Sequence, residues 1–428
     1  MNRRTPPDLI SLVSCHRIVV CVGSGGVGKT TVAAALALWG ALHGQRTAVL
    51  TIDPAKRLAT CLGLEETRQQ EHPLPPEAFA PYGLSPSGTL TAMLVDQQRA
   101  WDAVVGRYAP TPEIHNRILA NRFYLGLSRT FAGSHEYMAL DTLATLVQRD
   151  IYDLIVVDTP PTKQALDFLE APQRVQRFLN SQVSKWFIQP SVTTGWVAFS
   201  AVNRTAAFLL RKIEAATGVS TLGDISEFFT AMQQMLADFG HRLTRVNQLL
   251  TSKETAFVLI TRPEEEVLAE TAAFLTDLHR LKAPLEGVVV NGVQEEWRTE
   301  PSWDEDAGTL AARLQTILHM RSKNHEQIQW LTKNFLAYQT LVRGEKKRLA
   351  HFRRALPTET SFTQVPILPA FPADLGGLLT LHQYLFATTK PQSRPHAQAK
   401  SKETRRDKGT RSDKGQRDTR LFRGARKT

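Results

Sequence analysis

The sequence predicts an α/β protein built on a doubly wound, mostly parallel sheet. Short apolar runs alternate with helical segments along the chain, and most of these runs are continuously apolar. Continuous runs are typical of parallel strands that helices cover on both faces. Such sheets bind their ligands at the carboxyl ends of the strands. The expected strands are 18–22, 47–52, 90–95, 153–157, 256–260, 287–290 and 365–368.

A glycine-rich segment between the first expected strand and an Ala/Leu-rich helical segment predicts a phosphate-binding loop. The glycines allow backbone N–H groups to surround phosphate oxygens, Lys29 brings a positive charge to the β- and γ-phosphates, and Thr30 offers its hydroxyl to Mg²⁺. The following helix points the positive end of its dipole at the same phosphates. A chance glycine turn is the alternative, but the strand–loop–helix context favours an ATP or GTP site. The loop residues are Gly23, Ser24, Gly25, Gly26, Val27, Gly28, Lys29, Thr30 and Thr31.

Two aspartates are expected at the same edge of the sheet as this loop. Asp53 follows the second expected strand, where a carboxylate can orient the attacking water and stand near the metal; the alternative is an Asp-Pro turn that only ends the strand. Asp158 ends the apolar run 154–157, as in the Walker-B pattern, and would hold Mg²⁺ through water. The turn after it, up to Thr162, would sense the γ-phosphate.

Charge divides the chain into a nearly neutral body and a basic tail. The net charge is +11, and from Lys390 onward 14 Lys and Arg face 4 Asp and Glu. We therefore expect an ATPase domain over 1–387, with helical insertions at about 97–149 and 172–252. The segment 388–428 is too polar to build a core and is expected to be a disordered tail. Such a tail can attract anionic lipid or nucleic acid.

Cysteine usage and hydropathy exclude several classes of protein. The three cysteines form no CxxC pair and no zinc spacing, so no structural zinc is expected. No 18-residue stretch is strongly apolar, and the composition is that of a cytoplasmic protein. In the second insertion, apolar residues recur at helical spacing over 225–250. This stripe either faces the core or forms a groove for an apolar client helix.

Five segments together resemble the ArsA family of deviant-Walker P-loop ATPases. GSGGVGKTT, TIDPAKRLATCLGL, DTPPTKQALDFLEAP, VVVNGV and LPAFPADLGGL occur in the family's order. The family includes ATPases that drive arsenite efflux pumps and ATPases that deliver tail-anchored membrane proteins. The resemblance implies ATP and Mg²⁺ as cofactors and a dimer or tandem pseudo-dimer. It makes Asp53 the water-activating residue beside the catalytic Lys29, and places adenine at Asn291 and the 369–378 loop with Pro369 and Phe371.

The sequence also departs from the family pattern. Ser24 stands where the family has a P-loop lysine that reaches the partner subunit's phosphates, and Lys56 or Arg57 is a candidate substitute. The family's zinc-binding CxxC and its arsenite-binding thiols have no counterpart. Three functions therefore compete: handling a hydrophobic client, energising a membrane anion pump, and ParA/MinD-like positioning through the basic tail. The expected partner is a second copy or a related ATPase subunit, together with a membrane-protein client or a membrane partner.

Overall fold

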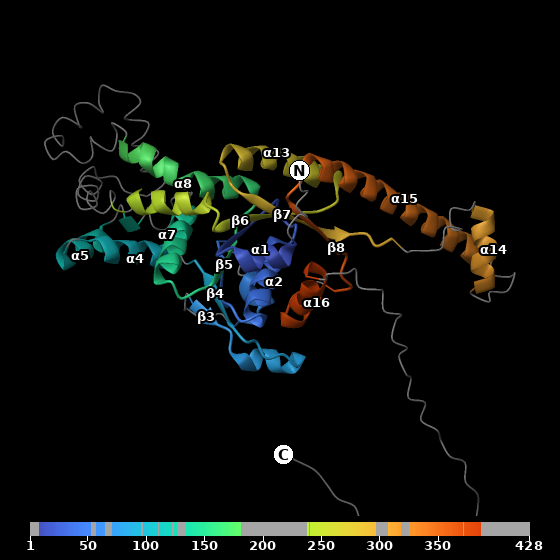
Figure 1. Cartoon of the computed structure of the whole chain (residues 1–428), viewed down its shortest axis with the longest axis horizontal. Helices are drawn as coiled ribbons and strands as arrows, with labels where there is room; N and C mark the ends of the chain where they lie inside the picture. The colour runs from blue at the N-terminus through green and yellow to red at the C-terminus, as the bar shows by residue number, and fades with distance from the viewer. Residues whose placement is uncertain are drawn as a thin grey trace, which may run out of the picture. The chain divides into compact units, whose positions relative to one another are not determined.

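The sheet of the computed structural model has eight strands in the order β3-β4-β2-β5-β1-β6-β7-β8 (Figure 1). All neighbouring pairs are parallel except β3 and β4, which confirms the predicted class. The structure describes residues 8–52, 57–64, 71–95, 97–109, 111–121, 124–125, 134–180, 238, 240–296, 307–317, 325–370 and 372–386. The strands are β1 Ile18–Val22, β2 Arg46–Thr51, β3 Glu71–Pro73, β4 Thr89–Leu94, β5 Leu154–Asp158, β6 Thr255–Thr261, β7 Leu285–Val293 and β8 Ser361–Pro366.

The two edge strands differ from the sequence prediction. β3 was not expected, because Glu71-His72-Pro73 is short and has no apolar run. β8 was expected at 365–368 but begins earlier, at Ser361, and ends at Pro366. An edge strand pairs on one side only, so it needs no continuous apolar sequence. Apolar runs in the sequence therefore do not mark where such a strand begins and ends. Beyond β8, the apolar side chain of Ile367 is 52% exposed.

The central strands are buried because helices cover both faces of the sheet. Along β1, Val19 and Cys21 point into one apolar cluster, whereas Ile18, Val20 and Val22 point into the other. This alternation places consecutive side chains on opposite faces. Helices α1 and α2 with α16 form one layer, and α7, α8 and α13 with the base of α15 form the other (Figure 1). The helices are α1 Leu9–Cys15, α2 Lys29–Leu42, α3 Arg57–Cys61, a 3-10 helix Pro76–Tyr82, α4 Gln97–Tyr108, α5 Pro112–Ala120, α7 Ser134–Arg149, α8 Thr162–Asn180, α13 Glu265–Arg280, α14 Ala307–Ile317, α15 His325–Ala355 and α16 Leu375–Leu385.

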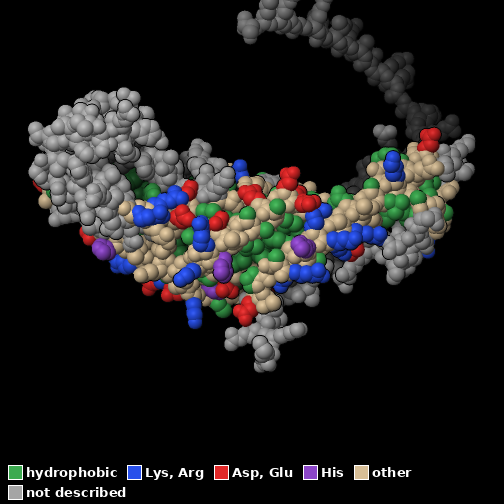
Figure 2. Space-filling model, turned by 90° about the horizontal axis from the view of Figure 1, so that it is seen from above, with side chains coloured by type: hydrophobic (Ala, Val, Ile, Leu, Met, Phe, Trp, Pro, Cys, Tyr) green, Lys and Arg blue, Asp and Glu red, His purple; other side chains and the backbone are tan. Residues whose placement is uncertain are grey.

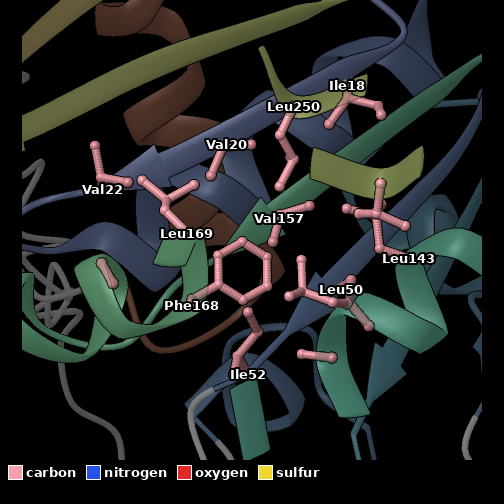
Figure 3. Packing of buried hydrophobic residues seen from close by; sticks show 14 of the residues in the cluster. Ile18, Val20, Val22, Leu50, Ile52, Leu143, Val157, Phe168, Leu169 and Leu250 are labelled. Atoms are coloured by element: carbon pink, nitrogen blue, oxygen red, sulfur yellow. The ribbon is translucent and has the colours of Figure 1, made fainter. Parts of the chain in front are cut away.

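The layer opposite α2 includes parts of both expected insertions. Leu143 of α7 and Phe168 of α8 pack with Leu250 over the side chains of β1, β2 and β5 (Figure 3). Leu243 and Val246 are buried in the same cluster, so the end of the apolar stripe faces the core. Residues 225–237 and 239 of that stripe lie outside the described residues. In the described part of the chain, no helix is long and apolar enough to span a membrane.

Polar side chains join the helices of this layer to one another. Asp141 of α7 forms ion pairs with Arg107 of α4 at 2.7 Å and with Arg242 at 2.8 Å, and the Asp141 and Arg242 side chains are each 6% exposed. On the outer surface of the layer, charged and hydrophobic side chains are interspersed (Figure 2). The sequence also predicts a helical stretch from 310 to about 349, and the structure has α14 and α15 in this region. The predicted tail lies outside the described residues.

Candidate nucleotide site

The glycine-rich loop connects β1 to α2 and lies against the ends of two neighbouring strands. Gly23, Gly26 and Gly28 have φ angles of 150°, 76° and 96°, a region that side chains disfavour. A Cβ on Gly23 would lie 2.0 Å from the Ile260 carbonyl oxygen in β6, and one on Gly28 would lie 2.5 Å from Asn291 Nδ2 in β7. Only glycine fits these positions, so the loop keeps the open backbone that a phosphate cradle needs.

Lys29 is the buried cation of this loop. Its side chain belongs to the first turn of α2, the residue is 7% exposed, and Nζ donates to the carbonyl oxygen of Ser24 at 2.7 Å. The ammonium group is therefore held inside the loop, where the sequence pattern places the phosphates. Ser24 is 2% exposed, and its hydroxyl makes no hydrogen bond within the described residues. Thr30 is half-buried in the same helical turn.

Asp158 ends β5 next to the strand that carries the loop. It pairs in register with Cys21 of β1 and Thr51 of β2, and Thr51 Oγ1 donates to Asp158 Oδ2 at 2.9 Å. Burial raises the pKa of the Cys21 thiol, with the Asp158 charge acting in the same direction and Lys29 against it. Asp158 is itself only 1% exposed.

The segment that follows Asp158 is hydrogen-bonded to the neighbouring strand β1 and to helix α13. Thr159 Oγ1 donates to the Cys21 carbonyl oxygen at 2.7 Å, and Thr162 Oγ1 donates to Glu270 Oε1 of α13 at 2.7 Å. A Cβ on Gly25 would lie 3.9 Å from Pro161 Cγ, so the segment also approaches the phosphate loop. Thr162 is the first residue of α8.

Comparison with known proteins identifies the family. The sequence pattern of the ArsA ATPases, described as anion-transporting ATPases, matches residues 16–329. The chain belongs to the ArsA ATPase family. It is accordingly an ATP-binding ATPase.

Individual relatives align over most of the chain. ATPase ASNA1 homolog 1 of Paramecium tetraurelia is 26% identical, over 68% of this chain and 80% of the relative. ATPase GET3 of Kluyveromyces lactis is 22% identical, over 83% of this chain and 93% of the relative. A putative arsenical pump-driving ATPase 1 of Aquifex aeolicus is 25% identical, over 65% of this chain and 64% of the relative.

The residues expected around adenine in this ArsA-family ATPase are partly described, and each has its own neighbours. Asn291, near the end of β7, donates from Nδ2 to the Val27 carbonyl oxygen at 2.9 Å, so its side chain lies on the phosphate loop. Pro369 is exposed and follows β8. Its loop is anchored at Pro372, whose carbonyl oxygen lies 3.5 Å from Cys61 Sγ. Phe371 lies outside the described residues, as do the expected catalytic Asp53 and the basic candidate Lys56.

A charged pocket beside the loop was not predicted from the sequence. Its volume is about 580 Å³, and it combines loop glycines with side chains that follow β6. The signal that could have found it is the charged run after the apolar strand 256–260, because strand ends at this edge face the ligand. The lining residues are Gly25, Gly26, Val27, Arg262, Glu264, Glu265, Glu266 and Val267.

Helix α15 fixes the ends of the two strands on this side of the site. Glu345 of α15 accepts a hydrogen bond from the Gln294 backbone N–H at 2.8 Å, just after β7. Arg348 Nε donates to the Pro263 carbonyl oxygen at 3.3 Å, just after β6. Burial raises the pKa of the Glu345 carboxyl, and the Gln294 hydrogen bond opposes that shift. The C-terminal part of α15 therefore fixes the segment that carries Arg262 relative to Asn291.

Proposed function

We propose that this protein is a Mg²⁺-dependent ATPase whose hydrolysis cycle rearranges a dimer and thereby handles or targets a hydrophobic or membrane-protein client. One observation carries the proposal. The segment 158–162 begins at the Asp158 carboxylate and continues directly into α8, which leads to the second helical insertion. A shift of this segment on loss of the γ-phosphate would therefore be passed to the insertion along one continuous helix.

Each site residue has a distinct task in this proposal. Lys29 binds the β- and γ-phosphates, and the loop glycines present backbone N–H groups to them. Thr30 and Asp158 fit a Mg²⁺ site, because they offer one hydroxyl and one carboxylate. Mg²⁺ at such sites takes few protein oxygens and completes its coordination with phosphate oxygens and water. When bound, Mg²⁺ neutralises charge on the phosphate oxygens. Asp53 positions the attacking water, and Asn291, Pro369 and Phe371 hold adenine.

Dimer rearrangement follows from the single phosphate loop in a family whose members work in pairs. A nucleotide that bridges two faces stabilises the closed pair through linkage. We expect a monomer–dimer equilibrium that moves toward dimer with a non-hydrolysable ATP analogue and back with ADP. Sedimentation at several concentrations in the two nucleotide states measures this shift. Identical mass distributions in both states would contradict the coupled dimer and leave the ATPase assignment standing.

Client handling is tested by capture of a defined apolar segment. The probe is a synthetic 20-residue transmembrane-type helix carrying a fluorophore, a length that matches the hydrocarbon core of a bilayer. Capture should differ between the ATP-analogue and ADP states, and Lys29→Ala should abolish that difference. The matched control is a polar helix of the same length. Equal capture of both helices in both nucleotide states would contradict a client function.

The family description also favours a second candidate, an ATPase that energises a membrane partner exporting an anion. Stimulation of hydrolysis by arsenite would support it. Arsenite binding needs several thiols together, but Cys15 is exposed whereas Cys21 and Cys61 are buried, and the described residues contain no group of three His, Cys, Asp or Glu side chains that could hold a metal ion. For this reason we rank client handling first. Both candidates, and ParA/MinD-like positioning through the basic tail, place the protein in the cytoplasm.

A further inference from the structure

Arg262 lies at the exposed rim of the phosphate loop. It follows β6, the strand next to β1, and it lines the same pocket as Gly25 and Gly26. A Cβ on Gly292 would lie 3.4 Å from Arg262 Nη2, so the guanidinium packs on the backbone beside Asn291. The Arg262 side chain thus lies between the phosphate loop and the end of β7, where Asn291 contacts the loop.

The guanidinium has donors to offer to a ligand. Its ion pair joins Nη2 to Glu264 Oε1 at 3.1 Å, and the two side chains are 41% and 51% exposed. An ion pair this exposed contributes little, so a stronger acceptor can displace Glu264. Arg262 Nε is buried and makes no hydrogen bond within the described residues. The planar fork of N–H groups matches two oxygens of a phosphate.

Among the described residues, no other basic group supplies charge at this rim. Arg262 is the one basic side chain among the described residues that line the pocket. Lys29 is turned inward to the Ser24 carbonyl oxygen. Arg57, a candidate substitute named from the sequence, is exposed on the short helix α3. Glutamates in the first turn of α13 line the same pocket and would repel a phosphate, and Arg262 is the cation that lines the pocket with them.

We propose that Arg262 binds a phosphate oxygen of the nucleotide held by its own loop and stabilises the charge that develops during hydrolysis. This rests on the proposed function, because it requires ATP at Lys29. In the reaction the water oxygen bonds to the γ-phosphorus while the bond to the β–γ bridging oxygen breaks, and its electron pair stays on ADP. The proton of the water ends on inorganic phosphate or in solvent. Arg262 transfers no proton and acts through its fixed charge.

The test compares two replacements that differ in charge. Arg262→Gln keeps hydrogen-bond donors but loses the charge, whereas Arg262→Lys keeps the charge but loses the fork. We expect Arg262→Gln to lower kcat by about 100-fold, as for loss of one transition-state donor, with a smaller change in KM. Arg262→Lys should recover part of kcat. The matched control is Arg280→Gln, an exposed arginine of α13 paired with Glu170 and Asp277, which should stay within about two-fold of wild type.

Three further readouts make the inference falsifiable. Melting temperature should match wild type in both Arg262 variants, and affinity for a fluorescent ATP analogue should fall far less than kcat. Wild-type kcat in Arg262→Gln would overturn the inference, as would equal losses in the Gln and Lys variants accompanied by a lower melting temperature. Mixing Arg262→Gln with Lys29→Ala should not restore activity, and restoration would overturn the assignment to the chain's own nucleotide. If wild type itself fails to hydrolyse ATP, the proposed function fails instead.

Discussion

The two faces of the sheet are stabilised in different ways. The layer of α2 and α16 is apolar almost throughout: twelve of the fourteen residues of α2 are buried, and most of them are Ala or Leu. The opposite layer of α7, α8 and α13 adds polar links to its apolar core, such as Thr162 to Glu270 and Asp141 to Arg242. Close-packed apolar contacts resist small displacements, whereas hydrogen bonds and ion pairs can be exchanged for others. We infer that the first layer holds the phosphate loop and the second responds to its occupant.

The largest expected effect is the loss of ATP binding on a substitution in α2, in the layer that holds the phosphate loop. Lys29→Ala removes the buried ammonium that the loop holds against the Ser24 carbonyl oxygen. ATP binding should fall below detection in titrations with a fluorescent analogue, and hydrolysis should fall to background. The matched control is Lys282→Ala, a lysine in the turn after α13, which should bind ATP as wild type does. Unchanged ATP affinity in Lys29→Ala would remove the phosphate role of this lysine.

The next effect separates binding from chemistry. Asp53→Asn keeps the size of the side chain but removes the carboxylate that is expected to position water. ATP affinity should stay at the wild-type value, while kcat should fall by at least about 100-fold. Single-turnover hydrolysis measures the chemical step, and titration with a fluorescent ATP analogue measures the affinity of each variant. Hydrolysis at the wild-type rate would show that Asp53 only ends its strand.

A third prediction breaks the polar links of the responsive layer. Asp141→Ala leaves the Arg242 guanidinium buried without its carboxylate, which we expect to cost about 3–5 kcal/mol in the free energy of unfolding. Urea denaturation measures it. The matched control is Asp167→Ala, which removes an exposed ion pair with Arg174 and should cost less than about 1 kcal/mol. Equal costs for the two variants would mean that the buried network does not stabilise this layer.

The smallest effect is expected for the tail. Deleting 388–428 removes a segment too polar to add to a core, so melting temperature and hydrolysis should match the full chain. Only salt-sensitive attraction to anionic vesicles or nucleic acid should be lost. A fall in melting temperature of more than a few degrees would contradict a disordered tail.

Local patterns predicted the features that depend on consecutive residues. The loop before Lys29 and the apolar run before Asp158 are both fixed by their own strand and turn; β1 has the predicted bounds, and β5 is shifted by one residue from the predicted 153–157. The edge strand β3 was missed because pairing with β4, not hydrophobicity, holds it. The Asn291 contact to Val27 joins residues 264 positions apart, and no local pattern encodes which backbone oxygen the side chain reaches.

Arg262 illustrates a different limit of sequence reasoning. Its charge is visible in the sequence, but a single arginine after a strand is ordinarily a solvated surface residue. What distinguishes it is the pocket that it shares with Gly25 and Gly26, and that pocket exists only because β6 lies next to β1. The basic candidates that the sequence suggests, Lys56 and Arg57, lie next to Asp53 in the chain, whereas Arg262 is more than 200 residues away from Asp53.

Hydrogen exchange on the two layers tests the central claim most directly, namely that the layer of α2 and α16 holds the phosphate loop while the layer of α8 and α13 responds to the bound nucleotide. Exchange is measured for α2 and α16 and for α8 and α13, with ADP and with a non-hydrolysable ATP analogue. We expect protection of α8 and α13 to change between the two states while α2 and α16 keep theirs. Thr162→Val, which loses the bond to Glu270, should weaken that change, and Thr276→Val, on the exposed side of α13, should not. Identical exchange of α8 and α13 in both nucleotide states, or equal changes in the two layers, would contradict the account.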